Sequence, residues 1–264
     1  MGKTVVITGA SAGIGLACAR LFLQNGWTVY CLSRTFSQPD PVRHIPTDVS
    51  DEDSVNQAFA QIKDECGQID LLINNAGFGI SGATEFTTLT DAKRLFDVNF
   101  FGGFCCAKAA IPLMRERGGR ILNVSSAAAI FSVPFQSFYS ASKSAVNALT
   151  LAFRNELAMF GISVCAVMPG DIKTHFTASR EKSFAGEDIY QGRIGPSVAV
   201  MEKDEQNGMS VVFISRFIYR VACKKHVSTI YTAGVKYKLF ALLSKCLPSR
   251  LVNFIVGKLY VKTK

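Results

Sequence analysis

Two side chains that can exchange a proton, Tyr139 and Lys143, lie four residues apart in the run Tyr-Ser-Ala-Ser-Lys. In a helix this separation puts both side chains on one face. A free phenol has a pKa of about 10, too high for a base at neutral pH, and a nearby ammonium favours the phenolate. We therefore expect Tyr139 to exchange a proton with a substrate oxygen while Lys143 lowers the pKa of the phenol.

A serine hydroxyl could hold the same substrate oxygen. Ser126 follows a short apolar run at 120–125 and precedes Tyr139 by 13 residues. Ser125 is the alternative, because neighbouring strand residues face opposite sides of a sheet. A Tyr and a Lys at this spacing are also common as unrelated surface neighbours, so the assignment needs support from the rest of the chain.

A glycine-rich turn near the amino end offers a place for a phosphate. The run Thr-Gly-Ala-Ser-Ala-Gly-Ile-Gly at 8–15 lies between a predicted strand and a predicted helix. The helix supplies free N–H groups and the positive end of its dipole. Gly9 would make the turn, Gly13 would permit close approach of the phosphate, and Gly15 would let the helix pack on the strand. The pattern indicates a dinucleotide site.

The end of the second predicted strand should lie beside the adenosine ribose of such a cofactor, about 20 residues on. Ser33 stands there, followed by Arg34, where an acidic residue would bind the 2′-hydroxyl of NAD. An arginine can form two charge-assisted hydrogen bonds with a 2′-phosphate. We therefore favour NADP(H) over NAD(H); the alternative is that Arg34 is a solvated loop charge. Asp48, after the third predicted strand, could accept a hydrogen bond from the adenine amino group.

Short apolar runs alternate with longer stretches of helical spacing in the front of the chain. Apolar runs bounded by turn residues are typical of parallel strands covered on both faces, and their alternation with helices predicts right-handed crossovers. We therefore expect an α/β fold with a doubly wound parallel sheet, in a single domain over 1–264. The predicted strands are 3–8, 28–33, 44–49, 70–75, 120–125, 162–168 and 228–232, and the predicted helices are 13–25, 51–66, 91–117 and 137–160.

The segment 170–208 breaks this alternation. It is polar, rich in glycine, and contains Phe176, Phe184 and Tyr190. A long irregular stretch inside a compact domain is typical of a lid over a binding site. We predict a substrate lid here, with a variable surface insertion as the alternative.

The C-terminal segment, 209–264, is basic and apolar. Residues 206–264 hold 11 Lys and Arg and no Asp or Glu, whereas 1–205 hold 18 basic and 20 acidic residues. This asymmetry indicates an anionic partner. The apolar runs at 239–247 and 251–261 are too short to span a bilayer, which takes about 20 residues. As amphipathic helices they could lie on a membrane surface or cap the substrate cleft, and the two interpretations are compatible.

Composition excludes several classes of protein. The chain has 264 residues, of which 48% are hydrophobic, so it is neither disordered nor fibrous. Its eight cysteines include no C-x-x-C pair, so we expect free thiols and no metal site. No basic motif with interleaved aromatic residues indicates nucleic-acid binding. A strand-like run begins at Lys3, which leaves no room for a secretory signal, and we expect a cytoplasmic protein.

Taken together, the motifs resemble those of the short-chain dehydrogenase/reductase family, and in particular its NADPH-dependent hydroxysteroid and lipid-ketone reductases. The resemblance covers 3–175, about two-thirds of the chain. Besides the glycine turn, Ser126, Tyr139 and Lys143, it rests on Asn74-Asn75-Ala76-Gly77, on Asn99 in Asp-Val-Asn, and on Pro169-Gly170-x-Ile172-x-Thr174.

The resemblance implies a Rossmann fold and a catalytic set of Asn99, Ser126, Tyr139 and Lys143. It implies that Asn99 supports a water-linked proton relay to Lys143, which also binds the nicotinamide ribose. It further implies that Asn75-Ala76-Gly77 stabilises the central sheet and borders the adenosine, and that Ile172 and Thr174 hold the carboxamide. The full set of expected cofactor contacts is Gly9, Ser11, Gly13, Ile14, Gly15, Ser33, Arg34, Asp48, Val49, Asn75, Ala76, Gly77, Tyr139, Lys143, Pro169, Gly170, Ile172 and Thr174.

The chain departs from the family pattern at two places. Many NADP-preferring relatives carry a basic residue just before the second glycine of the turn, where this chain has Ala12. Many relatives also end in a glycine-rich segment that completes a tetramer, whereas this chain ends in a basic, apolar tail. The family's helices at 91–117 and 137–160 commonly form a dimer interface, so we expect a homodimer.

We therefore predict an NADP(H)-dependent oxidoreductase that interconverts a ketone and a secondary alcohol. The 20 Phe residues and the apolar tail favour a small hydrophobic substrate: a steroid, a long-chain keto-lipid or an acyl-dihydroxyacetone phosphate. The tail adds peripheral contact with a membrane. The alternatives are a dinucleotide-binding sensor or scaffold without catalysis, and a sugar-nucleotide epimerase or dehydratase.

Overall fold

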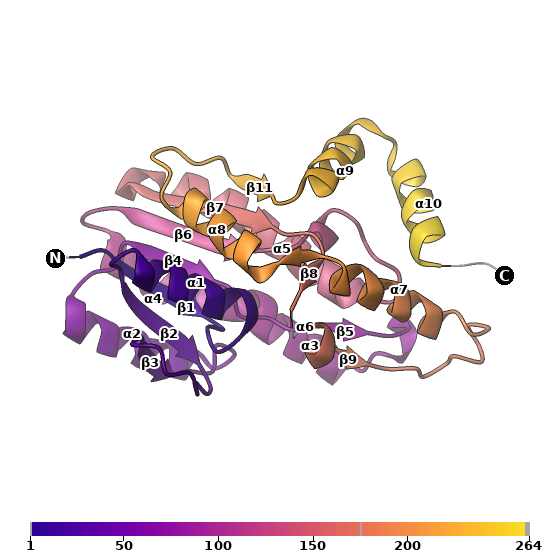
Figure 1. The fold of residues 1–264 in the computed structure, drawn as a ribbon, viewed down its shortest axis with the longest axis horizontal. Coiled ribbons are helices and arrows are strands. Elements are labelled where there is room, and N and C mark those ends of the chain that lie inside the picture. Colours follow the sequence, from indigo (N-terminus) through magenta and orange to yellow (C-terminus); the bar gives the residue numbers. More distant parts are fainter. Residues whose placement is uncertain (1, 175, 262–264) are drawn as a thin grey trace.

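Seven parallel strands form the central sheet of the protein, in a computed structural model that describes residues 2–174 and 176–261 (Figure 1). Their order across the sheet is β11-β7-β6-β4-β1-β2-β3, so the chain winds outward in both directions from β1. The predicted doubly wound α/β fold is confirmed. The strands are β1 (Thr4–Thr8), β2 (Thr28–Ser33), β3 (Arg43–Pro46), β4 (Leu71–Asn74), β6 (Gly119–Val124), β7 (Ile162–Met168) and β11 (Ile230–Thr232).

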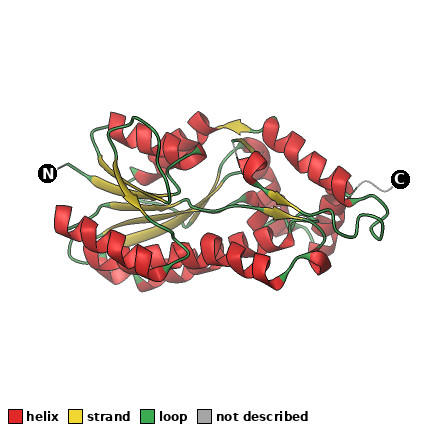
Figure 2. Ribbon diagram, turned by 90° about the horizontal axis from the view of Figure 1, so that it is seen from below, coloured by secondary structure: helices red, strands yellow, loops and turns green. Residues whose placement is uncertain are grey.

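Helices cover both faces of this sheet (Figure 2). Alternate strand residues supply the two cores: Val5 and Ile7 face one layer of helices, and Val6 faces the other. Each such buried aliphatic side chain contributes about 1.5–3 kcal/mol. One layer contains α1 (Gly13–Gln24) and α8 (Val211–Ala222), and the other contains α2 (Glu52–Cys66), α4 (Gly102–Met114) and α5 (Ser137–Glu156).

The carboxyl ends of the strands meet at one edge of the sheet. The chain reverses its winding between β1 and β4, and in open α/β sheets ligands bind in the crevice at that point. The turn after β1 holds the glycine-rich run, and Asn75 follows β4. Ser126 and Pro169 follow β6 and β7 on the same edge. The sheet therefore gathers the predicted motifs in one place.

The predicted helix at 91–117 is not continuous. It consists of α3 (Leu89–Phe96), one widened turn of π-helix (Asp97–Phe101) and α4. A π turn inserts a single residue, which helical spacing in the sequence does not reveal. Asn99 lies in this turn and is buried.

The prediction of an irregular segment at 170–208 is correct for 183–193, which holds turns but no helix or strand, and wrong for most of the remainder. The segment contains β8 (Ile172–Lys173), α6 (Phe176–Ser179), β9 (Glu181–Lys182) and α7 (Ile194–Gln206). The glycines and the proline of this segment lie between helices and strands or in the first turn of α7, where proline is tolerated. Strand β8 pairs with β10 (Met209–Ser210), and β9 pairs with β5 (Ile80–Ser81). Both pairs tie the segment to the body.

The C-terminal segment divides into two parts. Helix α8 and strand β11 belong to the core, whereas α9 (Val235–Cys246) and α10 (Ser249–Tyr260) form an arm that stands beside the body (Figure 1, yellow end). The two helices predicted on either side of Pro248 are therefore present. We call α9 and α10 together the C-terminal arm.

The state of the cysteines, membrane-spanning helices and metal sites can be assessed for residues 2–174 and 176–261. All eight cysteines are free. No helix there has the length and apolar character needed to cross a membrane. No group of three or more His, Cys, Asp or Glu side chains within these ranges is arranged to hold a metal ion.

Candidate active site

A cavity of about 1100 Å³ runs along the carboxyl ends of the strands. It is lined by the turns after β1, β2, β4, β6 and β7, by the segment after β8, and by the C-terminal arm. The predicted catalytic and cofactor-contacting residues all line it except Gly15, which lies behind the glycine turn, and Asn99, which borders a smaller cavity. One end of the cavity thus holds the dinucleotide motif and the other holds the arm.

The glycine turn is packed so closely that side chains would not fit. A Cβ at Gly15 would lie 2.4 Å from the carbonyl oxygen of Gly9, and a Cβ at Gly9 would lie 2.8 Å from the Cα of Ala76. Gly9 and Gly13 also have positive φ, at 64° and 55°. Ala12 occupies the N-cap position of α1, and its side chain cannot accept a hydrogen bond. The first N–H groups of the helix therefore face the cavity with no side-chain acceptor from the N-cap residue.

Thr8 and Asn75 join the glycine turn to the end of β4. The Thr8 hydroxyl oxygen accepts from the backbone N–H groups of Asn75, at 2.9 Å, and Ala76, at 3.0 Å. The Asn75 side-chain amide donates to the carbonyl oxygens of Thr8 and Gly9, at 3.0 and 3.2 Å. These bonds hold the wall of the cavity in place on both sides of the crevice.

The outer end of the cavity carries Ser33, Arg34 and Asp48. The Ser33 hydroxyl donates to the carbonyl oxygen of Thr35 at 3.0 Å, so it is turned toward the backbone. Arg34 is exposed at the rim. A hydrogen bond from the Ser50 hydroxyl, at 2.6 Å, lowers the pKa of Asp48, and the positive charge of Arg34 lowers it further. This end therefore presents one cation and one anion.

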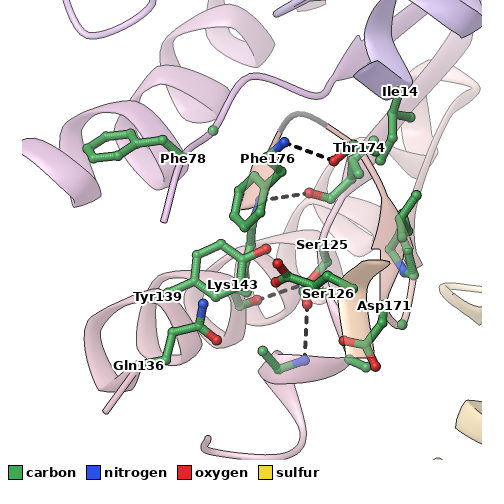
Figure 3. Close-up of a pocket in the computed structure, with 18 of the residues that line it drawn as sticks. Ile14, Phe78, Ser125, Ser126, Gln136, Tyr139, Lys143, Asp171, Thr174 and Phe176 are labelled. Atoms are coloured by element: carbon green, nitrogen blue, oxygen red, sulfur yellow. Dashed lines mark hydrogen bonds between the residues drawn. The ribbon is translucent and has the colours of Figure 1, made fainter. Parts of the chain in front are cut away.

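Tyr139 lies in the first turn of α5 and points into the cavity beside Ser126 (Figure 3). Its ring packs at 5.6 Å between centroids against Phe176. Burial raises the pKa of Tyr139 to about 12, and the hydrogen bond with Ser126 only partly offsets this rise. At neutral pH the phenol is thus protonated and able to donate a proton.

Lys143 lies one turn further along α5 and is buried. Its ammonium donates to the carbonyl oxygen of Val124 at 3.0 Å and lies 5.8 Å from the centroid of the Tyr139 ring. Burial lowers the pKa of Lys143 to about 8. The shared helix face is confirmed, but the expected lowering of the Tyr139 pKa is wrong for the protein alone. The lysine points at β6, and burial dominates the titration of both groups.

The two candidate serines have different surroundings. The Ser125 side chain is buried and donates to the carbonyl oxygen of Lys143 at 3.2 Å. The Ser126 hydroxyl oxygen accepts from the backbone N–H of Ala128 at 3.1 Å and faces Tyr139. The geometry therefore favours Ser126 as the hydroxyl next to a substrate oxygen.

Asn99 is fixed by three hydrogen bonds. Its side chain accepts from the backbone N–H of Phe78 and donates to the Phe78 carbonyl, both at 2.9 Å, and donates to Ser142 at 3.3 Å. Asn99 and Lys143 border a second cavity of about 20 Å³. That volume is sufficient for one water molecule among polar groups.

Several residues at the far end of the cavity escape sequence reasoning. The Tyr237 hydroxyl, from α9, donates to Asp171, and its ring occupies the space that a Cβ at Gly170 would need. Gln136 lines the wall near Tyr139, and Glu205 forms an ion pair with the buried Arg180. Asp171 directly follows the Pro-Gly motif, and this position is a weak indication that it lines the cavity. The contacts of Tyr237 and Glu205 join segments distant in sequence, so no local pattern predicts them.

Comparisons with known proteins show what this chain is similar to. The family model described as short chain dehydrogenase matches residues 3–184. A 3-ketodihydrosphingosine reductase of Bacteroides thetaiotaomicron is 37% identical over 98% of this chain and 98% of its own length. The solved structure of ElxO with NADP bound is 28% identical, with a TM-score of 0.75 over 90% of this chain and 100% of that one. A Burkholderia phymatum chain in complex with NAD is 20% identical and shares the fold, with a TM-score of 0.77 over 92% of each chain.

Proposed function

The chain belongs to the short-chain dehydrogenase/reductase family, and from this premise we propose that it is an NADP(H)-dependent reductase of a lipid-like ketone. The observation that carries the proposal is the grouping of Ser126, Tyr139 and Lys143 in one cavity with the glycine turn. The close packing around Gly9 and Gly15 and the uncapped start of α1 suit the phosphates of a dinucleotide.

The proposed reaction adds a hydride and a proton to a carbonyl group. When bound, NADPH supplies the hydride to the carbonyl carbon. Ser126 and Tyr139 hold the carbonyl oxygen, and the Tyr139 phenol donates its proton to that oxygen as it gains charge. With a pKa of about 12, the phenol carries this proton at neutral pH.

The proton is then returned to Tyr139 from Lys143. With a pKa of about 8, Lys143 is largely an ammonium at neutral pH and can give up a proton readily. Asn99 and the small cavity that it shares with Lys143 provide a route for a water molecule to resupply that proton. This assignment keeps Asn99 in a relay role without contact with substrate.

Our preference for NADP(H) rests on Arg34. Among the residues that the structure describes, it forms no ion pair within 4 Å, so its guanidinium is available for a 2′-phosphate. The nearby negative charge of Asp48 would keep that guanidinium at the rim of the cavity. The alternative is NAD(H), and a comparison of the binding of NADPH and NADH distinguishes the two.

The lining of the cavity and the name of one relative support a lipid-like substrate. Beyond Tyr139 the lining includes Phe131, Phe176, Phe240 and apolar side chains of α10, beside charged residues such as Asp171 and Glu205. A long alkyl chain fits such a lining, which favours a long-chain keto-lipid over a steroid, in line with the name of the Bacteroides relative. The segment 170–208 serves as one wall of this space.

A panel of ketones tests the proposed function. Oxidation of NADPH should be fastest with long-chain ketones and slow with small soluble ones. A protein that binds NADPH yet oxidises it with no ketone in the panel would instead be a sensor or scaffold. Substituting NADH in the same assay tests the cofactor preference.

For assembly and location we propose a cytoplasmic homodimer that touches a membrane from one side. The outer faces of the π turn and α5 expose Phe101 and Leu151, which supports an interface formed by this layer of helices. Light scattering of the purified protein measures the assembly, and cell fractionation measures the location.

A further inference from the structure

The C-terminal arm has two different faces along each helix. On α9, one face holds Tyr237, Phe240 and Ser244, which line the cavity together with Leu247 just after the helix. The opposite face holds apolar side chains at helical spacing that do not line the cavity. Of these, Leu239 is 54% exposed and Leu242 is 60% exposed. On α10, Val252 and Val256 line the cavity while Phe254 is 60% exposed.

Few contacts hold the arm to the body. Among the described residues, Val256 is the one side chain of the two helices that is buried. The arm is fastened by the hydrogen bond from Tyr237 to Asp171 and by an edge-to-face contact of Phe240 with Phe131, at 6.1 Å between centroids. Packing among residues 2–174 and 176–261 therefore does not explain the exposed apolar side chains.

Three apolar side chains of the arm line the cavity and keep much of their surface accessible to solvent: Leu243 is 40%, Ile255 43% and Leu259 54% exposed. The part of the cavity lining that α9 and α10 supply is therefore apolar and within reach of solvent. An alkyl chain that leaves the cavity here would pass directly onto the exposed apolar face of the arm.

The charges of the arm decide between possible occupants of that face. Its ionisable side chains in 235–260, apart from tyrosine and cysteine, are all cationic; Lys236 lines the cavity, and the others, which do not, are Lys238, Lys245, Arg250 and Lys258. A second copy docked by the same face would bring these cations against one another. An anionic lipid surface matches both the charge and the apolar side chains, and helices of this kind lie in the plane of the interface.

We propose that the outer face of the C-terminal arm rests on an anionic lipid bilayer, and that the ketone enters the cavity from that bilayer between Leu243, Ile255 and Leu259. This inference rests on the proposed function for the identity of the ligand, but binding to the bilayer is a separate property. The arm thereby joins the membrane to the active site without spanning the membrane.

The test uses the full chain and vesicles of phosphatidylcholine with or without phosphatidylglycerol. Sedimentation should show stronger binding to the anionic vesicles, and binding should weaken in high salt because surface charges are screened. Each basic residue near such a surface is worth about 1 kcal/mol, or about fivefold in partitioning. The variant Lys238→Glu/Lys245→Glu/Arg250→Glu should therefore bind at least about a hundredfold less.

A second variant removes apolar contact without changing charge. Leu239→Ser/Leu242→Ser/Phe254→Ser should lose vesicle binding while keeping the turnover of a small soluble ketone within about twofold. Its turnover of a long-chain ketone embedded in vesicles should fall much further. Matched controls are Lys63→Glu/Lys93→Glu/Arg117→Glu for charge and Leu89→Ser/Ile189→Ser for exposed apolar side chains elsewhere. Both controls should bind vesicles as the unmodified protein does.

Three results would overturn the inference: equal binding to neutral and anionic vesicles, arm variants that bind as their controls do, or arm variants that change the size of the assembly. The last result would make the face an interface between copies of the chain. Failure of the proposed function looks different, because vesicle binding would persist while no ketone is reduced.

Discussion

Substitution of Gly15 tests whether the glycine turn is built as a tight support for a phosphate. In Gly15→Ala the new Cβ would lie 2.4 Å from the Gly9 carbonyl oxygen, 2.6 Å from the Asn75 amide nitrogen and 2.9 Å from the Cα of Ala10. Two of these neighbours are backbone atoms, so α1 must move away from β1. Overpacking of this kind costs about 1–3 kcal/mol, or about 2–10 °C in melting temperature for a chain of this size.

The same movement shifts the N–H groups at the start of α1, so NADPH binding should weaken by at least about tenfold. The matched control is Gly257→Ala in α10, where an added Cβ meets nothing within 4 Å and helix propensity predicts a slight gain in stability. Thermal unfolding and NADPH titration of both variants measure the effect. If Gly15→Ala melts and binds NADPH as the unmodified protein does, the steric argument is refuted.

Three further predictions concern the chemistry. Ser126→Ala should lower turnover by about 10²–10³-fold, as loss of a donor to a developing oxyanion does. Ser125→Ala should mainly lower the melting temperature. Steady-state kinetics in which Ser125→Ala loses more turnover than Ser126→Ala would contradict the assignment. Arg34→Ala should weaken NADPH binding by about ten- to hundredfold and leave NADH binding nearly unchanged, by titration with each cofactor; equal weakening of both would refute the 2′-phosphate contact. Because burial lowers the pKa of Lys143 to about 8, ketone reduction should decline as pH rises through 8. Between pH 8 and the ordinary lysine pKa of 10.5, the unfolded chain binds a proton at Lys143 that the folded chain does not. The free energy of unfolding should therefore rise with pH in this range. A Lys143→Met variant with the same stability profile would contradict this.

Local patterns account for the parts of the fold that the sequence predicts well. The apolar runs that became β1, β2 and β7 are buried strands with clear turns at their ends, so their positions are almost as predicted. The glycine turn and the Tyr139–Lys143 spacing are equally local. The glycine turn is recognised from the end of a single strand, and the Tyr139–Lys143 pair from a single helix face.

Features that depend on distant contacts are missed. The π turn at Asp97–Phe101 is stabilised by Asn99 bridging to Phe78, which spacing within the helix does not show. Strands β8 and β9 are short and form by pairing with β10 and β5. The Tyr237–Asp171 bond likewise joins residues 66 positions apart.

The titration of Tyr139 illustrates a different limit. The four-residue spacing correctly places Lys143 on the same face, but it does not reveal where the ammonium points. In the structure that ammonium is bonded to Val124 and both groups are buried, which reverses the expected direction of the tyrosine shift. The phenol therefore carries its proton at neutral pH.

The most direct test of the central claim is the Tyr139→Phe variant, assayed for turnover and for NADPH binding with the same preparation. The substitution keeps the ring against Phe176 and removes the exchangeable proton. Turnover of the best ketone should fall by about 10²–10⁴-fold, while NADPH binding stays nearly unchanged. A variant that retains most of its turnover would contradict the assignment of Tyr139 as the proton donor.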